Sequence, residues 1–166
     1  AVEVCGAEYG LAIHWGKVHL VQVGTQQRVK TPSNDTLPPQ ESMLYLGSTI
    51  HANGTFACEV SRKLGTAAAD FKSLSNVWKH AEISMKRKIY LLDSLILCKL
   101  RYGVAGAWLS KSDLRRMDGF HARCLRQMMR IKPSYISRIS NDTVRQRAGQ
   151  GKLSTSIRRA QLTLLG

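Results

Sequence analysis

The sequence has few cysteines and no long apolar run, and each shortage excludes a class of protein. Its four cysteines lie far apart and form no Cys-x-x-Cys pair: Cys5, Cys58, Cys98 and Cys124. They therefore indicate neither a zinc site nor a disulfide framework, and we expect reduced thiols that are mostly buried. No apolar run approaches the roughly 18 residues that a membrane-spanning helix needs. No secretory or transit segment is visible either, so no membrane partner is expected.

Acidic residues are also scarce, and the shortage is confined to one part of the chain. Residues 57–166 hold 22 Lys and Arg against 7 Asp and Glu, a balance of +15, whereas residues 1–56 hold 3 against 4, a balance of −1. Clustered cations attract phosphate through charge and counterion release. The chain has 166 residues and 43% hydrophobic content, which is enough for one core. The composition favours a folded protein with a nucleic-acid partner.

The hydrophobic pattern changes from period two to periods three and four after the Asn53-Gly54 turn. Before this turn we expect a short helix closed by Gly10, strands over 18–23 and 42–50, and a proline-containing loop over 24–40. After it we expect five helices, over about 57–79, 84–108, 112–130, 141–148 and 154–165. The pattern predicts an α+β, mostly α fold, with a short β hairpin followed by a helical bundle. Because the helix over 84–108 is apolar most of the way round, we expect it at the centre.

The helix that Ser112 or Ser110 could cap carries the sharpest charge pattern. At about 100° per residue, its arginines share one arc opposite the apolar residues: Arg115, Arg116, Arg123, Arg126 and Arg130. Guanidinium groups in one stripe repel each other, so an external anion such as phosphate would stabilise them. A solvated helix face is the plain alternative, and a membrane-surface or calmodulin-target helix is another.

Two smaller features bear on binding. Lys86, Arg87 and Lys88 fall in the first turn of the helix that Ser84 caps, where the helix dipole already presents positive charge. They could form a phosphate seat, or a solvated turn.

His121 and Cys124 are three residues apart on a helix, but two such residues without a second pair are more often core residues than metal ligands. We expect no metal site.

Three motifs, taken in order and spacing, connect the chain to a family. They are Tyr9-Gly10-Leu11-Ala12-Ile13-His14-Trp15-Gly16-Lys17-Val18, then Tyr45-Leu46-Gly47-Ser48, then Leu114-Arg115-Arg116-Met117-Asp118-Gly119-Phe120-His121-Ala122-Arg123-Cys124-Leu125-Arg126. With them, the chain resembles the carboxy-terminal part of the reverse transcriptases of non-LTR (LINE-type) retrotransposons. His14 and Val18 depart from the family pattern.

The resemblance implies a division of the chain and roles for some residues. It makes residues 1–56 the end of the palm, 57–132 a helical thumb and 133–166 a helical extension. Tyr45, Leu46, Gly47 and Ser48 would be the primer grip, although Tyr45 and Leu46 could equally be hairpin core. Lys17 would approach the phosphates of the incoming nucleotide, or it could be an ordinary lysine at the start of a strand.

The resemblance also shows what the chain lacks. Polymerisation by this family needs adjacent aspartates that hold two metal ions, and this sequence has no Asp-Asp. We therefore expect no enzyme activity and no cofactor for this chain alone, with Mg²⁺ implied only for a full-length family member. The chain starts at Ala1 without Met and looks like a piece of a longer protein.

The expected partners are an RNA/DNA hybrid or an RNA template with its primer, and the remaining palm and fingers. The expected location is intracellular, in the nucleus or the cytoplasm. The alternative is a stand-alone or degenerate basic helical module that binds RNA or DNA without an enzymatic role.

Overall fold

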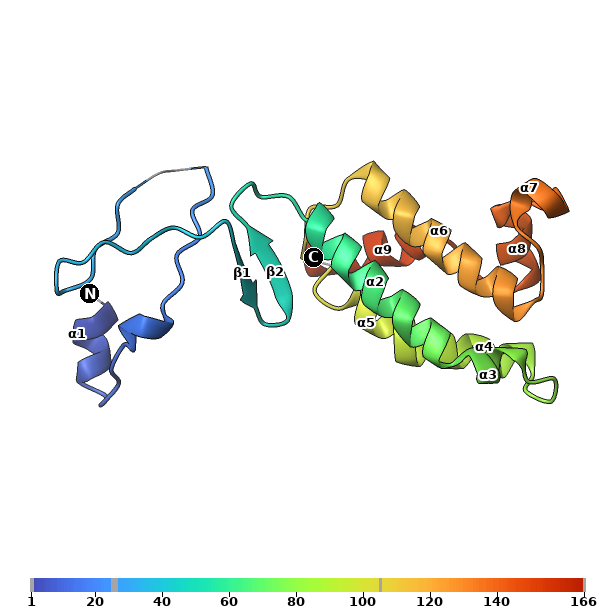
Figure 1. Cartoon of the computed structure of the whole chain (residues 1–166), viewed down its shortest axis with the longest axis horizontal. Coiled ribbons are helices and arrows are strands. Elements are labelled where there is room, and N and C mark those ends of the chain that lie inside the picture. Colours follow the sequence, from blue (N-terminus) through green and yellow to red (C-terminus); the bar gives the residue numbers. More distant parts are fainter. Residues whose placement is uncertain (1, 25–26, 105, 166) are drawn as a thin grey trace. The chain divides into compact units, whose positions relative to one another are not determined.

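The computed structural model describes residues 2–24, 27–104 and 106–165 (Figure 1). The fold is α+β and mostly α, as the sequence predicts, and the sheet of the described residues is one antiparallel hairpin. The chain divides into two compact units, Ala1–Thr55 and Phe56–Gly166. Residues 1, 25, 26 and 105 lie outside the described residues, so the expected first helix, the loop over 24–40 and the helix over 84–108 are each described only in part.

The first unit contains little regular structure. Helix α1 (Val2–Ala7) and the 3₁₀ turn η1 (Trp15–Lys17) are followed by extended chain. Gly10 follows α1 in the left-handed conformation expected of it, with φ 71°. The strand expected over 18–23 is wrong, because Leu20 forms only an isolated bridge with Pro39. Proline has no N–H, so it cannot extend such a bridge into a ladder.

The hairpin consists of β1 (Ser42–Tyr45) and β2 (Ser48–His51), with Met43 opposite Ile50. The single strand that the residue pattern predicts over 42–50 is therefore wrong, whereas a short hairpin lies at the Tyr45-Leu46-Gly47-Ser48 motif, where the resemblance implies one. The chain reverses at Leu46 and Gly47, whose φ angles are 47° and 78°. Two consecutive positive φ angles are typical of the tight turn that matches the twist of paired strands.

The second unit is helical throughout. Its elements are α2 (Ala57–Ser73), α3 (Ser75–Lys79), α4 (Met85–Leu92), the π-helical turn η2 (Asp93–Leu97), α5 (Cys98–Arg101), α6 (Lys111–Met128), α7 (Ser134–Ser137), α8 (Asn141–Arg147) and α9 (Leu153–Leu165). The last two confirm the expected helices over 141–148 and 154–165, whereas α7 and the π-helical turn were not expected.

Two of the expected long helices are shorter or interrupted. The one over 57–79 breaks at Leu74, where the indole N–H of Trp78 donates to the carbonyl of Phe71 at 2.7 Å and holds α3 against the end of α2. The one over 84–108 begins as expected at Ser84, whose hydroxyl accepts from the N–H of Arg87. It ends at Arg101, because Gly103 (φ 70°) turns the chain away.

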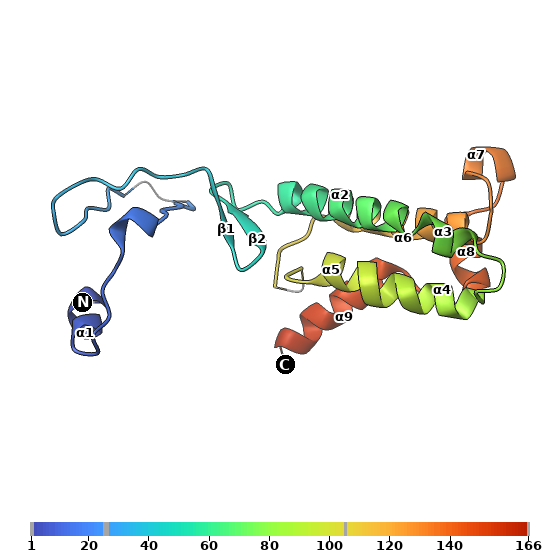
Figure 2. The same cartoon turned by 60° about the horizontal axis from the view of Figure 1, so that its bottom comes forward.

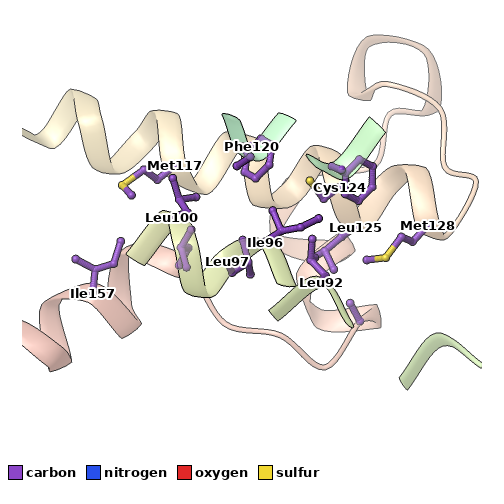
Figure 3. Packing of buried hydrophobic residues seen from close by; sticks show 14 of the residues in the cluster. Leu92, Ile96, Leu97, Leu100, Met117, Phe120, Cys124, Leu125, Met128 and Ile157 are labelled. Atoms are coloured by element: carbon purple, nitrogen blue, oxygen red, sulfur yellow. The ribbon is translucent and has the colours of Figure 1, made fainter. Parts of the chain in front are cut away.

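Helix α6 lies at the centre of the helical unit, and not the helix over 84–108 as expected. It packs against α2, α3, α4, α8 and α9 (Figure 2). The apolar face of α6 packs in one core with side chains of α4, η2 and α5 (Figure 3). From α6 come Met117, Phe120, Leu125 and Met128, and from the other three elements come Leu92, Ile96, Leu97 and Leu100. Val144 and Ile157 bring the last part of the chain into the same core.

The cysteines differ from the expectation that most would be buried. Only Cys124 is buried, while Cys5, Cys58 and Cys98 are exposed and all four are free thiols. Burial raises the pKa of the Cys124 thiol to about 12, so this thiol stays protonated in the folded chain. Among the described residues, no helix has both the length and the apolar character needed to cross a membrane.

Candidate nucleic-acid interface

Helix α6 carries the candidate cations, and a hydrogen-bonded cap defines the residue at which it begins. The hydroxyl of Ser110 accepts from the N–H of Asp113 at 3.1 Å, and the Asp113 carboxylate accepts in return from the Ser110 N–H at 3.3 Å. This reciprocal capping box selects Ser110 over the other candidate cap, Ser112. The apolar face of α6 is buried as expected, so the opposite face points to solvent.

Three arginines form the exposed part of the predicted stripe. Arg115 and Arg123 are exposed and make no hydrogen bond or ion pair within the described part of the chain. Arg116 is half exposed, lies 3.5 Å from the Asp113 carboxylate and donates to the Ser61 hydroxyl at 2.7 Å. We name Arg115, Arg116 and Arg123 the α6 cationic face. The first and last keep their full hydrogen-bonding capacity for an anion.

Arg126 was expected in the same stripe, and that expectation is wrong. Its side chain is only 6% exposed, and its guanidinium donates to four acceptors: Asn141 Oδ1 and Ser137 Oγ, and the carbonyls of Lys132 and Ile139. A planar group with five donors suits such a set of acceptors. Arg126 therefore fixes the loop that connects α6 to α8 and is not available to phosphate.

The prediction that Arg130 shares this stripe is also wrong. Helix α6 ends at Met128, and Arg130 adopts a left-handed conformation with φ 56°. Its guanidinium donates to the carbonyl of Lys79 at 3.0 Å, at the end of α3. The side chain remains exposed, but it lies beyond the helix and outside the α6 cationic face.

A groove runs along the contact between α2 and α6 and encloses about 680 Å³. Arg116 and Arg123 line it from α6, and Leu64 and Gly65 line it from α2. Gly119 lies between the two arginines, and Ser134 and Tyr135 of α7 close one end. The sequence analysis missed Gly65, Gly119 and Tyr135. The spacing 116, 119, 123 could have placed Gly119 on the arginine face.

The Lys86-Arg87-Lys88 cluster is divided by the fold. Lys86 and Arg87 are exposed, and the Arg87 guanidinium lies 6.0 Å from the ring centre of Tyr90. Lys88 is buried, and its ammonium donates to the carbonyl of His80 at 2.8 Å. The expected three-cation phosphate seat is therefore wrong for Lys88, which closes the turn between α3 and α4.

In the first unit, Lys17 is exposed at the end of the 3₁₀ turn η1. It does not start a strand, so the expected strand start is wrong, and its contact with a phosphate stays a prediction. Tyr45, Leu46, Gly47 and Ser48 form the tip of the hairpin, and the Leu46 side chain is 73% exposed. Because the Tyr45 side chain is exposed as well, neither residue is hairpin core in this structure.

No side chain described in residues 4–24 and 27–55 is fully buried. Large apolar side chains there are instead exposed, including Tyr9, Leu11, Leu44 and Leu46. A segment with this pattern has surface that another protein segment can cover. The helical unit differs, since the buried hydrophobic residues in the described part of the chain all belong to it.

Most of the aspartates make contacts within the protein. Of the six, five carboxylates bind protein groups: Asp70, Asp93, Asp113, Asp118 and Asp142. Within the described residues no three His, Cys, Asp or Glu side chains gather where they could hold a metal ion. This donor set does not fit the two Mg²⁺ ions of a polymerase centre.

His121 is a buried core residue, as expected from its place on the helix. It is 3% exposed, and neither ring nitrogen has a hydrogen-bond partner. Burial is the main cause that lowers its pKa, and the nearby Arg145 lowers it further, while Asp118 acts in the opposite direction. The ring is therefore neutral at pH 7.

Comparison of the chain with protein-family models, curated proteins and solved structures finds no match.

Proposed function

We propose that this chain binds the backbone of a primer-template duplex, as the palm end and thumb of a non-LTR retrotransposon reverse transcriptase. The observation that carries the proposal is the α6 cationic face, which lies on a rigid helix within a unit of net charge +15 over residues 57–166. Lys and Arg contacts to phosphate hold a duplex without reading its sequence. The assignment to the family rests on the sequence motifs.

The same proposal gives the chain no catalytic step of its own. Its aspartates cap helices and form ion pairs, and they do not fit a two-metal site. The duplex would be held by this chain, and the polymerase chemistry would belong to the parent protein. The exposed apolar side chains of residues 4–55 suit a segment that the rest of a palm covers.

The test is fluorescence anisotropy with an RNA/DNA hybrid duplex over a salt series. We expect the slope of log K against log salt to fall by roughly 0.9 for each phosphate contact removed when Arg115, Arg116 and Arg123 are changed to Gln. The matched control changes Arg147, Arg158 and Arg159 to Gln, because these exposed arginines remove the same charge elsewhere. A slope that falls equally in both variants would indicate a general charge effect, and absence of binding would contradict the proposal.

One observation favours a second candidate, a stand-alone basic helical module that binds RNA or DNA. Among the described residues, the buried hydrophobic side chains all belong to residues 56–166, as expected of a unit with a core of its own. The coding sequence upstream of Ala1 separates the two candidates. An open frame that encodes adjacent aspartates supports the polymerase fragment, and a stop codon directly upstream supports the module.

A further inference from the structure

The floor of the groove between α2 and α6 is bare backbone at two places. A Cβ atom at Gly65 or at Gly119 would meet no atom within 4 Å. Neither residue has a positive φ, so neither the backbone conformation nor the packing of this chain requires glycine there. Because glycine inside a helix destabilises it relative to alanine, two unneeded glycines at one groove point to something that approaches the backbone closely.

The walls of the groove carry charge that suits phosphate. Arg116, Gly119 and Arg123 are spaced three and four residues apart, so they lie on one face of α6 with bare backbone between two guanidinium groups. Arg123 makes no hydrogen bond or ion pair among the described residues. Arg126 sits beneath them, with its donors already used inside the protein. An anion in the groove would thus meet one free and one partly engaged guanidinium.

An aromatic side chain that lines the groove favours one form of nucleic acid. The bases of a duplex already stack on one another, so only an unpaired base can lie flat on such a ring. Tyr135, at the end of the groove, is 79% exposed and offers a ring on which an unpaired base can stack.

We propose that this groove binds an unpaired nucleic-acid strand, with phosphate between Arg116 and Arg123 and a base stacked on Tyr135. The inference rests on the proposed nucleic-acid-binding function and adds to it a place for the single strand that extends from a duplex held on the α6 cationic face. Arg116 and Arg123 would serve both the duplex and the strand that continues from it, whereas Arg115 lies outside the groove and would contact the duplex alone.

The test compares two RNA/DNA hybrid probes by anisotropy with the full chain: a blunt-ended duplex, and the same duplex with a single-stranded overhang of about six nucleotides. Gly65→Leu and Gly119→Leu fill the groove without changing charge, and leucine favours the helix. Thr66→Leu is the control, because it adds the same side chain to α2 at an exposed position that does not line the groove.

The wild-type chain should bind the overhang probe several-fold more tightly than the blunt one. Both glycine variants should lose this advantage and keep the affinity for the blunt probe, and Thr66→Leu should match the wild type. Tyr135→Ala, at an exposed site, should also weaken binding of the overhang probe alone, by about fivefold or more.

The remaining outcomes show whether the groove inference or the proposed duplex-binding function is wrong. If the wild type binds both probes equally, or if the filled variants keep the advantage, the groove inference is wrong and duplex binding stands. If the filled variants lose both probes equally, the groove belongs to the duplex-binding surface and the inference is again wrong. If the wild type binds neither probe, the proposed function itself fails.

Discussion

Asp118 on α6 accepts two hydrogen bonds from Ser154 on α9, from the backbone N–H at 2.9 Å and from the hydroxyl at 2.7 Å. The two residues are 36 positions apart in the sequence, so this contact closes the last helix onto the central one. The bonds involve a charged acceptor, which makes them stronger than neutral hydrogen bonds. The contact also gives the Ser154 N–H, in the first turn of α9, an acceptor that the helix itself cannot supply.

Replacing Asp118 with Ala should therefore destabilise the helical unit by about 2 kcal/mol, since hydrogen bonds to charged groups contribute about 1.5–3 kcal/mol. Urea unfolding followed by circular dichroism measures the change. Glu82→Ala is the control, because Glu82 is exposed and makes no hydrogen bond or ion pair among the described residues. Equal stability of the two variants would show that the contact between α6 and α9 contributes nothing.

Arg126 should behave as a structural residue and not as a binding residue. Changing it to Met leaves the partly buried acceptors without this donor, including the carbonyls of Lys132 and Ile139, and should lower the free energy of unfolding by about 2 kcal/mol. Arg123→Met, on the exposed side of the same helix, should leave stability almost unchanged and weaken duplex binding. The two readouts are urea unfolding and anisotropy. A stable Arg126→Met that binds less tightly would instead return Arg126 to the cationic face.

The difference between Arg123 and Arg126 shows how far the sequence could predict this site. Helical periodicity identified the buried face of α6, because apolar spacing is a local property of the chain. The same periodicity cannot show that residues 132–141 fold back over one end of the opposite, arginine-bearing face and bury Arg126. It also cannot locate the helix end, which leaves Arg130 outside the helix.

The hairpin shows a second limit. The run from Ser42 to Ile50 contains many strand-forming residues, so a single strand was expected, and the turn at Leu46 and Gly47 was not visible in the pattern. Leucine in a left-handed conformation is uncommon, since its Cβ crowds the backbone. The groove was missed for another reason: helical spacing could place Gly119 on the arginine face, but it could not show that Gly65 of α2 and Tyr135 of α7 lie beside it.

The turn conformation predicts the effect of Leu46→Asn. Asparagine tolerates a left-handed conformation better than leucine, so the variant should stabilise the hairpin by about 1 kcal/mol. Amide hydrogen exchange of β1 and β2 should become slower, and Gly47→Ala should make it faster because Gly47 has φ 78°. Unchanged exchange in both variants would show that the turn does not limit opening of the hairpin.

His121 predicts a stability that depends on pH. Burial first, and then Arg145, lower its pKa in the folded chain from the ordinary value of 6.5, while Asp118 and Asp93 act in the opposite direction and Arg101 adds to the lowering. As the pH falls, the unfolded chain therefore takes up this proton before the folded chain does. The contribution of the neutral ring to stability is complete above pH 6.5 and declines as the pH falls from there towards the lower folded pKa.

Urea unfolding at about pH 8 and about pH 5 should show this loss in the wild-type chain, since acid in that range protonates the unfolded histidine. His121→Leu should remove most of the pH dependence, because leucine does not titrate and leaves no unpaired nitrogen in the core. The pKa of Asp142 is lowered by its hydrogen bond with Arg145, so its titration lies below this range. If wild type and His121→Leu lose equal stability between the two pH values, the loss arises elsewhere and His121 is not the group that titrates.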